Sequence, residues 1–451
     1  MNNRAKILRH LSYQLPNNPK TYLYLFISSV VSIFAIVLFL ELADFSQNLF
    51  KYLNADMPYL SLALTPAVFA AIVYFDKNSL SFSGGSGVPQ LIAATDSRNK
   101  KIRLMLLSFK IAIGKIFLVS FSVLGGASVS FGGPSVHVGS SIFYNFSHRI
   151  KLKRKLLINA IIAMGGSVGL IVAFNAPIAG FLFAFEEIGR NLKKQALVLI
   201  AIVVFISYMI ASIYHGKTPY LANLDNLYFD ITNIWKLIPL VLITGILGAL
   251  FAKLALNLIS KFVFAKNSKV VIFAIVCGLI VGSINSINIH ASGSGEREIV
   301  MMLSGDKLGY EYIFAKFIAS LASFASTIAG GLFMTSISIG AAIGSELSDF
   351  YQQIDMQIMV LFGMVSYLSA VIRTPLTAAF LVLEMSGSLE LILPSLLIAF
   401  VSSYISKQIS KKPIYEALAD YYLKASNQKG FTTTKITTAN NIRTGNSLNQ
   451  R

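Results

Sequence analysis

Four uninterrupted apolar runs constrain this chain more than any other feature of the sequence. They cover residues 21–40, 156–185, 195–216 and 270–289, and none of them contains a lysine, arginine, aspartate or glutamate. About 20 mostly apolar residues suffice for a helix to cross the hydrocarbon layer of a bilayer. The composition agrees, since 55% of the 451 residues are hydrophobic and 13% are charged. These features exclude a soluble protein and predict one all-α integral membrane unit.

The charged residues predict the orientation of this unit. Lysines and arginines number 38 against 20 aspartates and glutamates, which gives a net charge of +18. The basic residues gather at residues 4–20, 98–103, 149–155, 190–194, 261–269 and 407–412. Cytoplasmic loops of membrane proteins have such an excess, so we expect these clusters and both chain termini in the cytoplasm. The charge is therefore attributed to topology, and no nucleic-acid partner is expected.

The sequence also resembles itself at an offset of roughly 200 residues. The matching segments are 85–87 with 293–295, 130–140 with 329–341, and 174–186 with 372–384. In the last pair, each segment places a glutamate nine residues after a proline. Three matches in one order predict a fused duplication. Membrane transporters with such halves commonly bind their substrate near the mid-plane, where the repeats meet.

The duplication divides the chain into five expected segments. They are a cytoplasmic N-terminal segment (1–20), a first membrane repeat (21–216), an extracytoplasmic loop (217–235), a second membrane repeat (236–423) and a disordered cytoplasmic tail (424–451). The end of the chain is rich in Thr, Asn, Ser and Gly, which is typical of disorder. A single cysteine, Cys277, and five scattered histidines argue against a disulfide framework and a metal centre, so no cofactor is expected.

Several glycine-rich segments interrupt apolar sequence. They are residues 84–89, 125–126, 132–134 and 330–331. Irregular backbone at membrane depth is tolerated only where protein buries it or where it lines a hydrated cavity. A helix that begins there points its unpaired N–H groups and the positive end of its dipole inward, which makes an anion site without a buried cation. For residues 125–126 the alternative stays open that glycine only allows close helix packing.

These segments resemble a known family, the CLC chloride channels and chloride/proton exchangers. Residues 85–89, GSGVP, resemble the family's GSGIP motif, and residues 331–333 resemble the start of its GxFxP motif. Further similar segments are residues 174–187, with the inner proton glutamate, residues 373–385, and residues 412–415, which resemble the KPLY segment with the pore tyrosine. The resemblance implies a membrane homodimer. Each subunit would have its own anion pathway and form an inverted repeat of tilted, partly spanning helices.

The resemblance also implies an anion site for chloride. Its expected residues are Ser86, Gly87, Gly132, Gly133, Gly331, Leu332, Phe333 and Tyr415. Ser86 and Tyr415 would offer their hydroxyls to the anion from opposite sides, and backbone amides around Gly331 would complete the coordination. Neutral donors suit a conducting site, because a direct lysine or arginine contact would hold a halide too tightly.

The sequence departs from the family at its most diagnostic motif, G-K/R-E-G-P. Residues 130–134 read SFGGP, so Gly132 stands at the gate position, where no carboxylate can occupy the anion site or accept a proton. Phe131 replaces the neighbouring basic residue. We expect Gly132 to make the outer site roomier. In the second half, Thr335 replaces the proline of GxFxP.

Two adjacent glutamates occupy the position of the exchangers' inner proton residue. Glu187 aligns with it and Glu186 precedes it, while Arg190 lies at helical spacing for an ion pair with either. Without an outer acceptor, a structural role for Glu187 is favoured over proton transfer. His137 is the nearest titratable substitute for the missing glutamate, although a lone histidine is more often a packing residue. Lys115 matches a lysine of bacterial exchangers, and it either biases the pathway positive or is paired internally.

The leading functional prediction is passive, proton-uncoupled chloride conduction, because Gly132 replaces the gating glutamate. The alternative is a chloride/proton antiporter with an unconventional outer acceptor such as His137. Other halides and nitrate are further candidate anions. The sequence has no HExxH or Walker motif, and we do not expect an enzyme. The resemblance to compact bacterial members implies a multi-pass protein of the bacterial inner membrane, embedded in its lipid bilayer.

Overall fold

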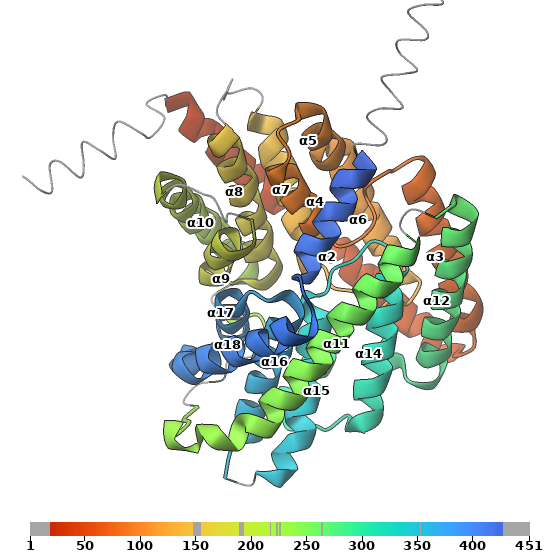
Figure 1. The fold of residues 1–451 in the computed structure, drawn as a ribbon, viewed down its shortest axis with the longest axis vertical. Coiled ribbons are helices and arrows are strands. Elements are labelled where there is room, and N and C mark those ends of the chain that lie inside the picture. The colour runs from red at the N-terminus through yellow and green to blue at the C-terminus, as the bar shows by residue number, and fades with distance from the viewer. Residues whose placement is uncertain are drawn as a thin grey trace, which may run out of the picture.

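The computed structural model describes residues 19–147, 155–188, 194–216, 218–221, 224, 227–262, 265–351 and 353–426. Within these ranges every regular element is a helix, and strand pairing is limited to two isolated bridges. Figure 1 shows the helices as one bundle in which segments from both ends of the chain lie together. The predicted all-α membrane fold is confirmed. Most of the predicted N-terminal segment and of the predicted tail, together with Arg190, lies outside the described residues.

The long helices have the length and apolarity of membrane spans. Six of them are α2 (Pro19–Asp56), α3 (Leu60–Asn78), α10 (Lys194–His215), α11 (Ile238–Phe262), α12 (Asn267–Ile287) and α18 (Ile392–Ile409). The seventh span consists of two consecutive helices, α5 (Lys100–Leu107) and α6 (Phe109–Leu124). In the described chain, seven segments meet this criterion. Phe34, Phe205 and Leu393 are 66%, 66% and 69% exposed, which suits a surface that faces lipid rather than water. The protein is a multi-pass membrane protein.

Shorter helices lie between the spans. In the first half these are α4 (Val88–Asp96), α7 (Gly132–Ser147), α8 (Lys155–Phe174) and α9 (Pro177–Phe183), and in the second α13 (Glu296–Leu303), α14 (Gly309–Ala325), α15 (Phe333–Leu347), α16 (Met356–Ile372) and α17 (Pro375–Ser386). Most of them are too short to cross a bilayer. Asn175 and Arg373 have left-handed backbone, at φ of 53° and 60°, and each turns the chain before a proline that begins the next helix.

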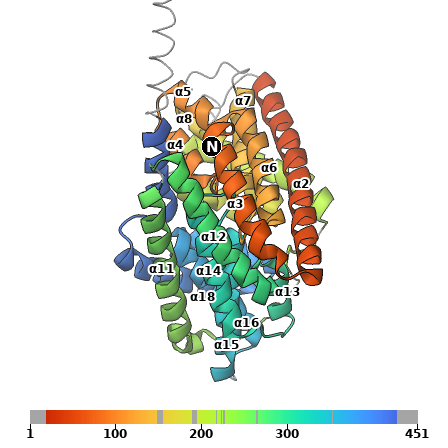
Figure 2. The ribbon, with the colours of Figure 1, turned by 90° about the vertical axis from the view of Figure 1, so that its right-hand side faces the viewer.

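The two halves repeat one order of helices in opposite directions. α4, α7, α8 and α9 of the first half correspond to α13, α15, α16 and α17 of the second. Figure 2 shows α2 descending from the upper end of the molecule and α11 rising from the lower end. The same close helix contact recurs in both halves. A Cβ on Gly139 of α7 would lie 2.3 Å from the carbonyl oxygen of Gly165 on α8, and a Cβ on Gly340 of α15 would lie 2.3 Å from that of Gly363 on α16. The predicted inverted repeat is confirmed.

Two glutamates fasten the halves to each other. Glu384, on α17, accepts the N–H groups of Ile178 and Ala179 at the start of α9, at 2.9 and 2.8 Å. Glu186 accepts those of Leu376 and Thr377 at the start of α17, at 3.1 and 2.7 Å. A carboxylate stabilises a helix N-terminus by satisfying its unpaired donors and by its favourable interaction with the dipole. The repeated spacing from proline to glutamate is therefore a pair of reciprocal caps.

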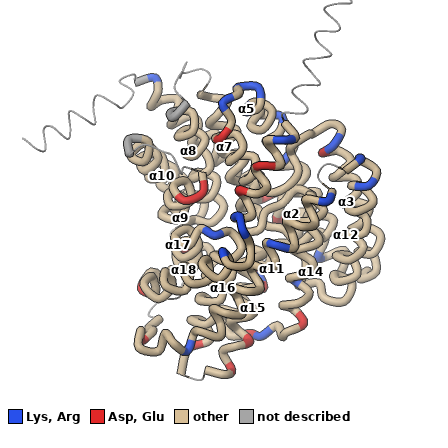
Figure 3. The backbone as a smooth tube through the Cα atoms, in the orientation of Figure 1, with Lys and Arg blue, Asp and Glu red and all other residues tan. Residues whose placement is uncertain are grey.

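Charge is distributed unevenly between the two ends of the molecule. Figure 3 shows lysines and arginines gathered around α5 at the upper end, where Lys100 and Lys101 begin that helix. The lower end has both signs. Lys307, between α13 and α14, pairs with Asp349. The upper end is the one that the basic clusters predict to be cytoplasmic.

Candidate functional site

Three helix N-termini meet in the middle of the molecule. The segments before α4, α7 and α15 are tied by backbone hydrogen bonds. Gly85 donates to Ile328 at 3.1 Å, while Ser130 and Gly331 donate to each other's carbonyl oxygens at 2.9 and 2.7 Å. The positive dipole ends of helices from both halves are thereby held together. Residues 84–89, 132–134 and 330–331 thus share one location, whereas Gly125 packs against Val68 on α3.

Two buried hydroxyls lie at this meeting point. Ser86 is 2% exposed, and Tyr415, in the helix formed by residues 414–426, is fully buried. The hydroxyls approach each other, yet neither forms a hydrogen bond of normal geometry within the described residues. The Ser86 hydroxyl also lies against α7, because a Cβ on Gly133 would be 2.4 Å from its oxygen. Buried hydroxyls normally have a hydrogen-bond partner. Both therefore retain a donor for a ligand.

Only some of the expected backbone amides remain available. The N–H of Gly87 donates to the Gln90 side chain at 3.0 Å, and that of Gly331 donates to Ser130. Gly87 has a φ of 102°, so its role is to turn the chain into α4. The N–H groups of Gly133, Leu332 and Phe333 have no backbone acceptor in the described chain. They are the open donors of two helix N-termini.

The space beside Gly132 is filled. A Cβ on Gly132 would lie 2.4 Å from both the Cε2 and the Cζ atom of Phe174, the last residue of α8. Phe174 is 3% exposed, and its ring centroid lies 6.1 Å from that of Phe333. The expectation that Gly132 makes the outer site roomier is wrong. An aromatic ring from another helix covers the glycine.

His137 is buried on α7. Its Nε2 atom lies 2.8 Å from the carbonyl oxygen of Leu106 on α5, and the side chain is fully buried. Its Cβ packs against the turn before α4, 2.5 Å from where a Cβ on Gly87 would stand. These contacts direct the imidazole toward α5, at the end predicted to be cytoplasmic. The geometry opposes its use as an outer proton acceptor.

Each half has a buried lysine whose ammonium group hydrogen-bonds a glycine-containing turn. The Lys115 ammonium donates to the carbonyl oxygens of Gly84 and Gly85, at 3.1 and 2.9 Å. Lys316 donates to those of Ala291, Ser292 and Gly293 at 3.2, 3.2 and 2.9 Å. Both lysines are fully buried. Lys115 is thus paired internally with the backbone next to Ser86. Sequence reasoning missed Lys316, which the repeat offset of roughly 200 residues would have found.

The two candidate proton residues lie in a short π-helix, η2 (Ala184–Ile188). Both carboxylate oxygens of Glu186 accept from the start of α17, so this residue is a structural cap. Glu187 is 2% exposed and close enough to Tyr415 to affect its hydroxyl electrostatically. The proposed ion pair with Arg190 lies outside the described residues. The predicted proton role of Glu187 stays a prediction.

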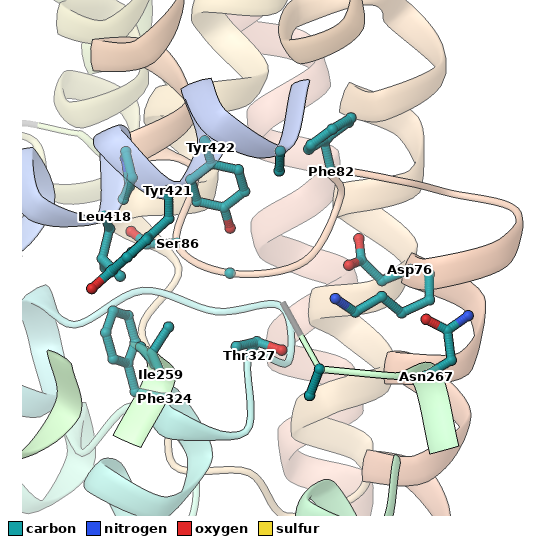
Figure 4. Close-up of a pocket in the computed structure, with 15 residues that line it drawn as sticks. Asp76, Phe82, Ser86, Ile259, Asn267, Phe324, Thr327, Leu418, Tyr421 and Tyr422 are labelled. Carbon is teal, nitrogen blue, oxygen red and sulfur yellow. The ribbon is translucent and has the colours of Figure 1, made fainter. Parts of the chain in front are cut away.

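A cavity of about 480 Å³ leads to the site from one end. Its lining includes Asp76 and Lys77 at the end of α3, Phe82, Ser86, Tyr421 and Tyr422. Figure 4 shows the Tyr422 hydroxyl pointing down into this space, across from Asp76, with Ser86 on its other side. A Cβ on Gly85 would stand 2.6 Å from the Tyr422 hydroxyl, so the glycine lets the tyrosine approach the turn. The cavity is a vestibule to Ser86 from the predicted cytoplasmic end.

Sequence comparison identifies relatives of known name. Residues 68–407 match the family model described as voltage gated chloride channel. The H(+)/Cl(−) exchange transporter ClcA of Citrobacter koseri is 27% identical over 369 residues, which cover 78% of this chain and 76% of that protein. The ClcA protein of Salmonella agona is 25% identical over 367 residues, with coverage of 78% and 76%.

Solved structures share the fold. A slow cyanobacterial Cl−/H+ antiporter has a TM-score of 0.79 at 20% identity, over 91% of this chain and all of that one. A CLC-type fluoride/proton antiporter has a TM-score of 0.72 at 17% identity, over 87% of this chain and 97% of that one. The family match spans most of the sequence, and these structures have the same architecture of broken helices. The chain therefore belongs to the voltage-gated chloride channel family, the CLC family.

Proposed function

We propose that this protein transports chloride by passive conduction that is not coupled to protons. The observation that supports it best is the convergence of the Ser86 and Tyr415 hydroxyls with the N-termini of α4, α7 and α15, beside a Gly132 that has no carboxylate. Neutral donors and dipole ends bind a desolvated halide while still allowing it to leave. We also propose that the protein is a homodimer of the bacterial inner membrane with both termini in the cytoplasm.

The absence of coupling is argued from the titratable residues near the pathway. A proton-coupled cycle needs an acceptor at each end, and Gly132 supplies none. His137 faces α5, and Glu186 uses both carboxylate oxygens on the start of α17. No outer proton acceptor is therefore recognisable among these residues of the described chain.

The direct test is paired ion flux from purified protein in liposomes. With a potassium ionophore to balance charge, we expect chloride to run down its gradient while the external pH stays constant. Tyr415→Phe should weaken chloride binding several-fold in calorimetry, because it removes one of two hydroxyl donors. Tyr367→Phe is the matched control, since Tyr367 is also fully buried with a hydroxyl that lacks a partner within the described residues, but it lies on α16. Uphill proton movement in fixed ratio to chloride would refute uncoupled conduction.

The alternative function is chloride/proton exchange, which is the activity printed for the two ClcA relatives. It requires an outer acceptor other than residue 132. In that case Glu187→Gln should abolish proton movement while chloride still flows. If the wild-type protein moves no protons, this alternative is excluded.

A further inference from the structure

We propose that the ring of Phe174 is the outer gate of the pathway, in the place where a side chain at residue 132 would lie. This inference rests on the proposed function, because it concerns how the same anion pathway opens. It assigns the gate to a residue of α8 rather than to α7, and it makes the gate a hydrocarbon ring rather than a carboxylate.

The first observation is steric. Two atoms of the Phe174 ring, Cε2 and Cζ, stand 2.4 Å from the position of a Cβ on Gly132, and Cδ2 of Phe333 stands 3.5 Å from it. The ring therefore rests directly on the first residue of α7. It covers the backbone next to the open N–H of Gly133. A buried apolar ring at a constriction excludes water and ions until it moves.

The second observation is the line of aromatic rings on which Phe174 lies. Its centroid is 6.1 Å from that of Phe333, and the Phe333 centroid is 6.2 Å from that of Tyr415. On the other side it is 6.0 Å from Tyr220, at an interplanar angle of 86°. Tyr220 belongs to the connection between the two halves, which the sequence predicts to be extracytoplasmic. Phe174 thus lies between the outer connection and the hydroxyl site.

Tyr220 fixes the ring in this position. Its hydroxyl donates to Oε2 of Glu296, the first residue of α13, at 2.8 Å. His215 packs against Tyr220 at a centroid distance of 6.2 Å, and its Nε2 lies 2.7 Å from the carbonyl oxygen of Val172, two residues before Phe174. The outer connection is thereby attached to both α8 and α13. Tyr220 and Glu296 are positioning residues for the gate.

An aromatic gate differs in kind from a carboxylate gate. A glutamate competes with the anion as a charge and leaves the site when it takes up a proton. A phenylalanine carries no charge and does not titrate, and the edge of its ring is electropositive. Opening requires the ring to rotate away from Gly132. The ring itself therefore carries no titratable group, and pH can reach the gate only through groups that position it, such as Glu296.

The experiment compares chloride efflux from liposomes that contain wild type, Phe174→Ala, Phe174→Leu or Phe251→Ala. Phe251 is the matched control, because it is equally buried but packs against Phe317 on α14. We expect about a tenfold rise for Phe174→Ala and a smaller one for Phe174→Leu, with Phe251→Ala unchanged. Folding of each variant is checked by size-exclusion chromatography and thermal unfolding. Equal flux in wild type and a folded Phe174 variant would overturn the gate and leave the proposed function standing. No chloride flux in any folded protein would overturn both.

A second measurement separates gating from packing. Tyr220→Phe keeps the ring and removes only the hydrogen bond to Glu296, as does Glu296→Gln in part. If Tyr220 acts through the gate, Tyr220→Phe raises flux in the wild-type background and has no further effect in Phe174→Ala. Equal effects of Tyr220→Phe in both backgrounds, or none in either, would contradict the assignment. This readout stands even if Phe174→Ala is poorly stable, because the Phe174→Leu background can replace it.

Discussion

Gly132 determines the chemistry at the outer end of the pathway. It lacks a side chain, and its Cα face is covered by the Phe174 ring. The first turn of α7 therefore meets hydrocarbon where the family resemblance implies a carboxylate. The next residue, Gly133, has an N–H group without a backbone acceptor in the described chain. Any side chain introduced at residue 132 would therefore displace the Phe174 ring and also approach the anion site.

The substitution Gly132→Glu tests this location. The new side chain must displace the Phe174 ring, and its charge will compete with the anion at the N-terminus of α7. We expect slower chloride flux near neutral pH and recovery at acid pH, because protonation removes the competing charge. Gly132→Gln is the control of equal size, which should slow flux without pH dependence. Flux that neither slows nor responds to pH in Gly132→Glu would mean that residue 132 lies off the pathway.

Motifs located the hydroxyl site at the residue scale but not its surroundings. Ser86 and Tyr415 were predicted together, and the structure buries both at the meeting of the two halves. The position of Phe174 was not foreseen, since it depends on how α8 packs on α7. Gly87 and Gly331 were expected among the anion-binding residues, but Gln90 and Ser130 accept hydrogen bonds from their N–H groups. Sequence does not reveal which donors the protein itself uses.

At the scale of elements, Lys115 and Lys316 support equivalent turns, before α4 in the first half and before α13 in the second. Lys115→Met removes the ammonium group that donates hydrogen bonds to the carbonyl oxygens of Gly84 and Gly85. The turn that positions Ser86 should then be less rigid. We expect a loss of about 1–3 kcal/mol in stability and weaker chloride binding. Lys316→Met should cost similar stability and leave chloride affinity unchanged, because its turn lies before α13. Thermal unfolding and calorimetry measure the two effects, and equal changes of affinity in both variants would contradict this division.

Helix boundaries were the less predictable part of the fold. The apolar runs indicated the spans at α2, α10 and α12, because a bilayer imposes length and composition. The run at residues 156–185 contains no charge that would show its division into α8 and α9. The break depends on the left-handed backbone of Asn175 and on a proline, which hydropathy does not register.

At the scale of the whole molecule, the orientation can be measured with cysteines. Cys277 is 4% exposed, so it contributes little background to labelling. Thr218→Cys, beyond the end of α10, should react with a membrane-impermeant maleimide on intact spheroplasts. Lys101→Cys on α5 should react only after the membrane is opened. The reverse pattern would invert the proposed topology.

Assembly is the second property of the whole molecule. α10 and α18 present large apolar side chains outward, among them Phe205 and Leu393. We expect light scattering of the purified protein to give about twice the chain mass of 49.2 kDa. A wild-type protein at the single-chain mass would exclude the dimer.

The reciprocal caps have a consequence for the origin of the chain. A cut in the connection between the halves would give two fragments, each with a helix start that only the other's glutamate can reach. Neither fragment could complete its own hydrogen bonding, but a mixture of the two could. Two identical ancestral chains would have exchanged the same pair of carboxylates between subunits. Fusion of their genes would have changed the covalent link and kept these hydrogen bonds.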